Sequence, residues 1–142
     1  MPMIPQPDSN EPDTVEKALL ALRAAHDEQT AVDACDGFLW AMGNNHAGTF
    51  HPVVLSVLPA VEQILVSGQP WAQRAVMESL IDLGGTFIPE PGYETYLGAS
   101  VQDALKAFIQ SLRHHLVALA TGDDARARSA ADLLELIDDQ AA

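Results

Sequence analysis

The sequence is poor in aromatic and in basic residues. Aromatic residues make up 6% of the 142 positions, so the core must consist of Leu, Ala, Val and Ile, which favours helices packed on helices. Seven Lys and Arg residues stand against twenty Asp and Glu residues, for a formal net charge of −13. Such a surface repels nucleic acid and anionic membranes, because each phosphate contact needs a cation. We therefore expect neither nucleic acid nor a membrane as a partner. A basic protein partner would explain the negative charge, and so would solubility alone.

Cysteines, long apolar runs and an N-terminal leader are also scarce or missing. Cys35 is the single cysteine, so the chain cannot form an internal disulfide. It lies in an apolar helical stretch, where we expect a thiol that behaves as a small hydrophobic group. No apolar run approaches membrane length, and no basic segment leads a hydrophobic run at the start. These absences predict a soluble, cytoplasmic protein.

Catalytic and metal-binding motifs are missing as well. His46 and His51 are five residues apart in a loop, and His114 and His115 are adjacent on a predicted helix, where neighbouring side chains point in different directions. No HExxH motif, cysteine pair, GxSxG serine or phosphate-binding glycine loop accompanies them. We therefore expect no metal, no cofactor and no catalytic residue, and predict that the protein is not an enzyme.

Six segments have apolar residues at helical spacing. They are residues 14–26, 29–42, 52–66, 70–83 and 100–119, and a last helix that follows Gly122. Pro52 and Pro70 fit first turns, Ser100 fits an N-cap, and Gly43 fits a left-handed residue after a helix end. Polar and apolar residues do not alternate over any long stretch, so we expect no strands and an all-α fold. Residues 1–12, with four prolines, are expected to be a flexible lead-in to a single domain over residues 13–139.

The helices contain a repeat. A shift of 41 positions places Leu39 on Leu80 and Gly43 on Gly84, so that "AVDACDGFLWAMG" matches "AQRAVMESLIDLG". A further shift of 54 places Leu80 on Leu134. Three helix pairs at a period of roughly 40 residues are typical of α-solenoids. With a mid-helix proline in "VLPAVEQIL" and the helix "WAQRAVMESLIDLG" after it, the region 14–138 resembles HEAT-like repeats.

The resemblance implies an α-solenoid of three helix pairs in which the second helix of each pair lines the concave side. The polar faces of these second helices would then form one acidic surface that binds a partner. We expect its residues to be Asp33, Asp36 and Trp40, then Glu78 and Asp82, then Asp132 and Glu135. Trp40 either anchors the partner or packs under a neighbouring loop, and the sequence leaves both alternatives open.

Two loops join the expected pairs. In "GNNHAGTFHPVV", residues 43–54, the motif Gly-Thr-Phe is followed two residues later by proline, and the same pattern recurs at residues 85–89. The recurrence predicts a structural connector in which phenylalanine closes the end of the helical layer. Asn44, Asn45 and His46 would brace backbone or contact the partner. Tyr93 and Tyr96, in "IPEPGYETY", would form an exposed aromatic surface or a flap between repeats.

We expect the acidic concave face to capture a basic protein. In size, charge and repeat type the chain is similar to the immunity proteins that bacteria encode beside secreted toxins, and this similarity implies an inhibitor of a toxin domain. An adaptor or assembly subunit with the same surface is the first alternative. A small hydrolase built on His46, His51 and Asp36 or Asp82 is the second, and its DNA-repair glycosylase form is opposed by the negative charge.

Overall fold

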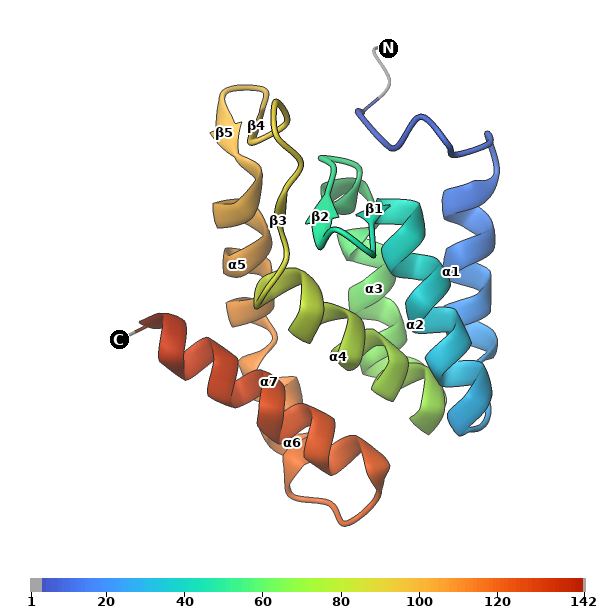
Figure 1. Ribbon diagram of the computed structural model, residues 1–142. Helices are drawn as coiled ribbons and strands as arrows, with labels where there is room; N and C mark the ends of the chain where they lie inside the picture. The colour runs from blue at the N-terminus through green and yellow to red at the C-terminus, as the bar shows by residue number, and fades with distance from the viewer. Residues whose placement is uncertain (1–3, 142) are drawn as a thin grey trace.

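The computed structural model describes residues 4–141, and most of this range is helical (Figure 1). Its seven helices are α1 (Thr14–Ala24), α2 (Glu28–Met42), α3 (Val54–Ser67), α4 (Pro70–Gly84), α5 (Val101–Ser111), α6 (Arg113–Ala120) and α7 (Ala125–Ala141). The apolar spacing in the sequence thus located each helical region to within a few residues, and the mostly helical fold is confirmed.

Local signals explain where several helices begin. The Ser100 hydroxyl accepts a hydrogen bond of 3.1 Å from the backbone N–H of Asp103, which confirms the expected cap of α5. Pro70 opens α4, as its fixed φ angle favours. At the start of α2, the Asp27 carboxylate accepts from the backbone N–H of Thr30, and the Thr30 hydroxyl accepts from the backbone N–H of Asp27. This capping box stabilises the start of α2 and was absent from the sequence prediction.

The predicted single helix over residues 100–119 is wrong. The chain forms α5 and α6 with a break at Leu112, whose backbone N–H bonds to the carbonyl of Ile109 at 3.1 Å, three residues back instead of four. The Ser111 hydroxyl donates to the carbonyl of Phe108, a side-chain bond that competes with the regular helical ladder and favours a bend. Leu112 and Leu116 are nevertheless both fully buried. The apolar spacing therefore continues through the break, and periodicity alone could not reveal it.

The helices pack in two layers. Helix α1 contacts α2, α3 contacts α4, and α6 contacts α7. Helix α4 also contacts both α2 and α7, and it lies between them in Figure 1. In the other layer α1 contacts α3, α3 contacts α5, and α5 contacts α6. One continuous cluster of buried apolar side chains fills the space between the layers, and its largest members include Phe38, Phe50, Leu65 and Leu80.

Short strands join the loops at one end of the helices. They are β1 (Gly43–Asn44), β2 (Thr49–Phe50), β3 (Ile88–Pro89), β4 (Thr95–Tyr96) and β5 (Ala99–Ser100). Strand β2 pairs antiparallel with β1 and parallel with β3, while β4 and β5 form a hairpin. Two-residue strands are too short to show alternation, so the expectation of no strands needs this correction. The two Gly-Thr-Phe loops meet through the β2–β3 pairing, and Phe50 and Phe87 are both buried as expected.

The backbone of Gly43 differs from the expected left-handed conformation. Its φ of −176° is extended, because the chain enters β1 directly after α2. A Cβ atom at this position would lie 2.0 Å from the carbonyl oxygen of Thr49 on the paired strand. The glycine is therefore required by a close backbone approach between β1 and β2 and not by a helix-ending turn.

Within the N-terminal segment, residues 4–10 contact the helices. The carbonyl of Pro5 accepts a hydrogen bond of 2.9 Å from the backbone N–H of Val53. The side-chain amide of Asn10 donates to the carbonyl of Ala41 at 2.9 Å, and Pro7 is buried. This part of the expected lead-in thus packs against the end of α2 and the start of α3, in contrast to the expectation of a segment apart from the fold. Residues 1–3 of that lead-in lie outside the described residues.

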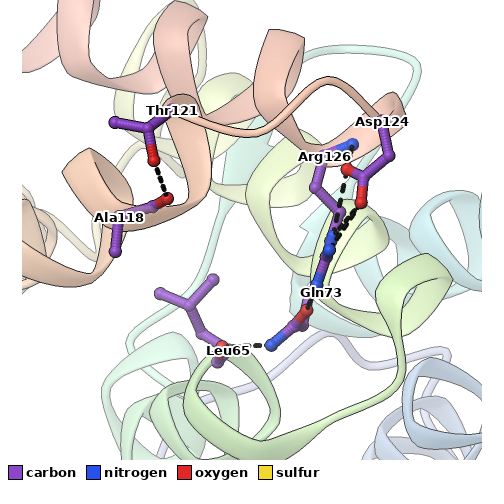
Figure 2. Close-up of polar contacts among 6 residues, drawn as sticks. All are labelled: Leu65, Gln73, Ala118, Thr121, Asp124 and Arg126. Carbon is purple, nitrogen blue, oxygen red and sulfur yellow. Dashed lines mark hydrogen bonds and ion pairs between the residues drawn. The ribbon is translucent and has the colours of Figure 1, made fainter.

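A polar joint connects α3, α4 and α7 (Figure 2). The buried amide of Gln73 donates to the carbonyl of Leu65 at 2.8 Å and accepts from the Arg126 guanidinium at 2.8 Å. Arg126 also forms an ion pair of 2.5 Å with Asp124, just before α7 begins. Leu65 lies in the last turn of α3, where carbonyls lack partners within the helix. Gln73 therefore satisfies a helix end and ties three helices together.

Candidate functional site

A groove with a volume of about 330 Å³ runs between α2 and α4. We call it the acidic groove. Its walls combine small or apolar side chains with several carboxylates, and the lining residues are Glu28, Ala31, Val32, Cys35, Asp36, Leu39, Asn45, Arg74, Ala75, Glu78 and Asp82. Except for the loop residue Asn45, all of them come from the two adjacent helices, which are in direct contact.

Helical geometry places the charged side chains along the groove. Arg74, Glu78 and Asp82 are spaced four residues apart, so they lie one above the other on the same face of α4. Glu28 and Asp36 flank the groove from α2 in the same way. Between them, buried residues such as Ala31, Leu39 and Ala75 form an apolar floor. The groove therefore offers an apolar surface beneath a charged rim.

The charge of the acidic groove is strongly negative. Its lining contains four carboxylates and one guanidinium, which gives a formal charge of −3 (1 minus 4). The guanidinium carbon of Arg74 lies 5.2 Å from the centre of the Trp71 ring, in a cation–π arrangement. Within residues 4–141, none of the four carboxylates forms an ion pair with a cation. Their negative potential is therefore left largely uncompensated.

Neutral groups and neighbouring acids surround these carboxylates. The Asn45 amide donates to Asp36 at 2.6 Å, and the Ser129 hydroxyl, from α7, donates to Glu78 at 2.8 Å. Burial raises the pKa of Asp82 above its ordinary value, and the nearby charge of Glu78 raises it further. Hydrogen bonds from neutral donors orient the carboxylates without cancelling their charge.

Cys35 lies beside these acids and is half-buried. The Ser79 hydroxyl donates to its sulfur at 3.3 Å. Burial raises the pKa of the thiol to about 11, and the neighbouring carboxylates act in the same direction. A thiol with this pKa is protonated at neutral pH, so it contributes an apolar wall to the groove, whereas nucleophilic chemistry would need the thiolate.

A second hollow, of about 340 Å³, lies at the loop end of the helices. We call it the loop-end pocket. Its lining comes from the N-terminal segment, the end of α2 and the loops that follow α2 and α4, and consists of Pro7, Asp8, Ser9, Trp40, Gly43, Asn44, His51, Glu90, Pro91 and Tyr93. The side chain of Trp40 is 46% exposed and that of Tyr93 39% exposed. The ring centres of His51 and Tyr93 are 4.9 Å apart.

The structure distributes the expected binding residues over several places. The acidic groove contains Asp36, Asn45, Glu78 and Asp82, and the loop-end pocket contains Trp40, Asn44 and Tyr93. Asp33 faces a different hollow along α1, Asp132 and Glu135 are exposed on α7, His46 is exposed in its loop, and Tyr96 is half-buried in β4. Of the residues expected on one acidic surface of the second helices, Asp36, Glu78 and Asp82 line the same groove, whereas Trp40 and Asp33 line other hollows. The carboxylates of α2 and α4 meet, whereas the aromatic residues gather elsewhere.

Several lining residues were missed in the sequence. Glu28 is eight residues before Asp36, so helical spacing could have placed it on the same face of α2. Asp8 and Glu90 join the loop-end pocket only through loop packing, for which the sequence carries no periodic signal. His51, which the sequence analysis considered only for the alternative hydrolase, joins it in the same way.

The residues of the alternative hydrolase do not share one pocket. Asp36 and Asp82 line the acidic groove, His51 lines the loop-end pocket, and His46 is exposed in the loop between α2 and α3. Over residues 4–141, no three His, Cys, Asp or Glu side chains are grouped as metal ligands require.

Comparisons with known proteins give no match: no protein-family model, no curated protein and no solved structure corresponds to the chain. In the described part of the chain, none of the helices combines the length and apolar character needed to cross a membrane. Function must therefore be inferred from the geometry of the acidic groove and the loop-end pocket themselves.

Proposed function

We propose that this protein captures a basic partner protein through the acidic groove. The observation that carries the proposal is the group of four carboxylates above an apolar floor, not paired with cations among the described residues. Neutral donors orient two of them, Asp36 and Glu78. A lysine or arginine of the partner fits this combination, because its aliphatic stem covers apolar surface while its charged end remains at the rim. The net charge of −13 adds long-range attraction that speeds the encounter.

Binding of a cation relieves an unfavourable feature of the free protein. The Asp82 carboxylate is partly buried beside Glu78, and both conditions disfavour its charged form. A positive charge placed between these carboxylates lowers the pKa of Asp82 and stabilises both anions. Part of the binding energy thus comes from charge repulsion that already exists in the free protein. Binding sites commonly contain such unfavourable charge interactions, which lower the stability of the free protein but favour binding.

We further propose that the helices form a HEAT-like array of three pairs. The direct contacts of α1 with α2, α3 with α4 and α6 with α7 support this arrangement, as does the position of α4 between α2 and α7. In such an array α7 extends the binding layer, and its exposed Glu135, with Asp132 beside it in an ion pair of 3.6 Å with Arg128, continues the charged surface beyond the groove. They would contribute long-range attraction and rim contacts.

The small size, acidity and helical pairing favour an immunity-type inhibitor that acts in the cytoplasm on a toxin domain. The inhibitor would cover a basic surface that the toxin needs for its own substrate, and opposite charges would make the capture fast. In an adaptor or assembly subunit the same groove would hold a partner without inhibiting it. An activity assay of the captured protein, with and without this chain, separates the two roles.

The test is affinity purification from the native cell with three tagged forms of the protein. They are the wild type, Glu78→Lys/Asp82→Lys in the groove, and Glu16→Lys/Glu62→Lys on the exposed faces of α1 and α3. The two variants change the net charge equally, so any difference between them reports position and not total charge. We expect a basic protein to be retained by the wild type and by the α1/α3 variant, and to be lost from the groove variant. Equal retention by all three forms would place the binding surface elsewhere.

A further inference from the structure

We propose that the loop-end pocket is a second binding site, which takes one arginine side chain from a loop of a protein partner. The pocket lies at the C-terminal end of α2, whereas the acidic groove lies between α2 and α4. The two hollows have no lining residue in common, so this inference stands whether or not the groove binds a partner.

The aromatic wall of the pocket is unusual for this chain. Phe38, Leu39 and Met42, the other large apolar residues at this end of α2, are at most 3% exposed, but Trp40 in their midst is 46% exposed. Tyr93 comes from the loop after α4 and is also open to solvent. A protein with so few aromatic residues thus places two of them on the wall of one hollow. Tryptophan and tyrosine are the residues that most often anchor protein partners.

The charges of the pocket specify a cation. Asp8 and Glu90 line it, and its lining contains no lysine or arginine. A guanidinium group can lie flat on the Trp40 indole face while its N–H groups donate to a carboxylate, which combines cation–π attraction with charge-assisted hydrogen bonds. An ammonium group lacks the planar face for this stacking. A volume of about 340 Å³ suits one side chain and is too small for a helix.

Backbone pairing holds the walls in place before any ligand arrives. The backbone N–H of His51 donates to the carbonyl of Met42 at 2.8 Å, and that of Glu90 donates to the carbonyl of Phe50 at 2.8 Å. The backbone N–H of Tyr93 donates to the carbonyl of Glu90 at 2.8 Å. The first two bonds extend the β1–β2–β3 pairing, and together the three bonds hold the backbone that carries His51, Glu90 and Tyr93. A pocket that is already formed binds its ligand with less loss of conformational freedom.

An arginine within a polypeptide fits better than free arginine. The free amino acid carries an α-ammonium and an α-carboxylate group, and bringing these two hydrated charges against the pocket costs desolvation energy. In a polypeptide both are replaced by neutral amides. The binding of a capped arginine relative to free arginine therefore distinguishes a protein side chain from a small metabolite.

The experiment uses the fluorescence of Trp40 in the full-length Trp71→Phe variant, in which it is the single tryptophan. N-acetyl-arginine-N-methylamide is titrated at low ionic strength, and the capped citrulline analogue serves as its neutral isostere. We expect a saturable change with capped arginine, and an affinity at least tenfold lower for capped citrulline, with capped lysine and free arginine also weaker. Tyr93→Ala and Asp8→Asn/Glu90→Gln should each weaken binding at least tenfold. Far-UV circular dichroism of every variant controls for folding.

Glu78→Gln/Asp82→Asn removes charge from the acidic groove and should leave the Trp40 titration unchanged. The proposal is overturned if capped citrulline binds as tightly as capped arginine, if Tyr93→Ala has no effect, or if the groove variant abolishes the response. If free arginine binds as tightly as capped arginine, the pocket does not distinguish a protein side chain from a small molecule, and the proposal is also overturned. Each variant changes only one hollow, so the experiment can refute arginine binding at the loop-end pocket without refuting partner capture by the acidic groove, and the reverse.

Discussion

Replacing Gln73 by methionine tests how α3, α4 and α7 are joined. The Gln73 side chain is 6% exposed and connects the carbonyl of Leu65 on α3 to Arg126 on α7 (Figure 2). Methionine has a similar length and shape but neither donates nor accepts a strong hydrogen bond. The substitution therefore removes the polar link while leaving the packing volume nearly unchanged.

The larger part of the expected cost comes from the carbonyl of Leu65. Leu65 is buried and lies in the last turn of α3, so its carbonyl would lose its partner in a place that water does not readily reach. An unsatisfied buried acceptor costs about 1–3 kcal/mol. Arg126 is partly exposed and retains its ion pair with Asp124, so the loss on that side is smaller. We expect Gln73→Met to lower the free energy of unfolding by about 2 kcal/mol, which corresponds to a decrease in Tm of about 6 °C for a chain of this size.

Urea unfolding followed by circular dichroism measures this change, with Gln110→Met on the exposed face of α5 as the matched control. The control should alter the free energy of unfolding by less than about 0.5 kcal/mol. A double-mutant cycle with Arg126→Met should give a coupling of about 0.5–1 kcal/mol between the two side chains. If Gln73→Met were no more costly than Gln110→Met, the amide would not be what joins α3 to α7, and the reasoning would be refuted.

Gly43→Ala should destabilise the protein by about 2 kcal/mol or more in urea unfolding, because its Cβ would collide with the Thr49 backbone; an effect below 0.5 kcal/mol would contradict the close approach. Leu97 is 86% exposed and has a φ of 53° in the two-residue turn of the β4–β5 hairpin. Leu97→Asn should raise the free energy of unfolding by about 0.5–1 kcal/mol, because asparagine tolerates this conformation. A lower free energy of unfolding would argue against the turn. Asp82→Asn should raise Tm at pH 7, because the folded-state pKa of Asp82 is raised and its charged form is therefore unfavourable in the fold. The difference in Tm between the variant and the wild type should shrink as the pH falls through the raised pKa, because the wild-type carboxyl is then protonated. A difference in Tm that does not change with pH would rule out this cause.

Local patterns predicted the helical regions and the mostly helical character of the chain. Apolar spacing located the helices because a helix that packs on one side must bury residues three and four apart. The same logic failed at Leu112, where the break leaves the buried stripe intact. It also failed at Gly43, whose role depends on Thr49 across a strand pairing that no local pattern encodes.

The candidate site was predictable only in part. Asp36, Glu78 and Asp82 meet because each lies on a helix face that spacing defines. Trp40 is four residues from Asp36 and shares that face in a helical projection, yet it lines a different hollow. The reason is that α2 ends two residues later and the loops packed there, residues 4–10 and 88–93, provide the other walls. Loop packing of this kind depends on contacts between distant segments and leaves no periodic trace in the sequence.

The proposed role of the acidic groove is tested most directly by association kinetics with the protein that the affinity purification retains. The rate constant is measured for Glu78→Lys/Asp82→Lys and for Glu16→Lys/Glu62→Lys, at salt concentrations from about 0.02 to 0.5 M. At low salt the groove variant should associate at least about tenfold more slowly than the variant of α1 and α3, although their net charges are equal, and the difference should narrow as salt screens the charges. Identical rates for the two variants at every salt concentration would mean that only total charge matters, and the acidic groove would then have no part in capture.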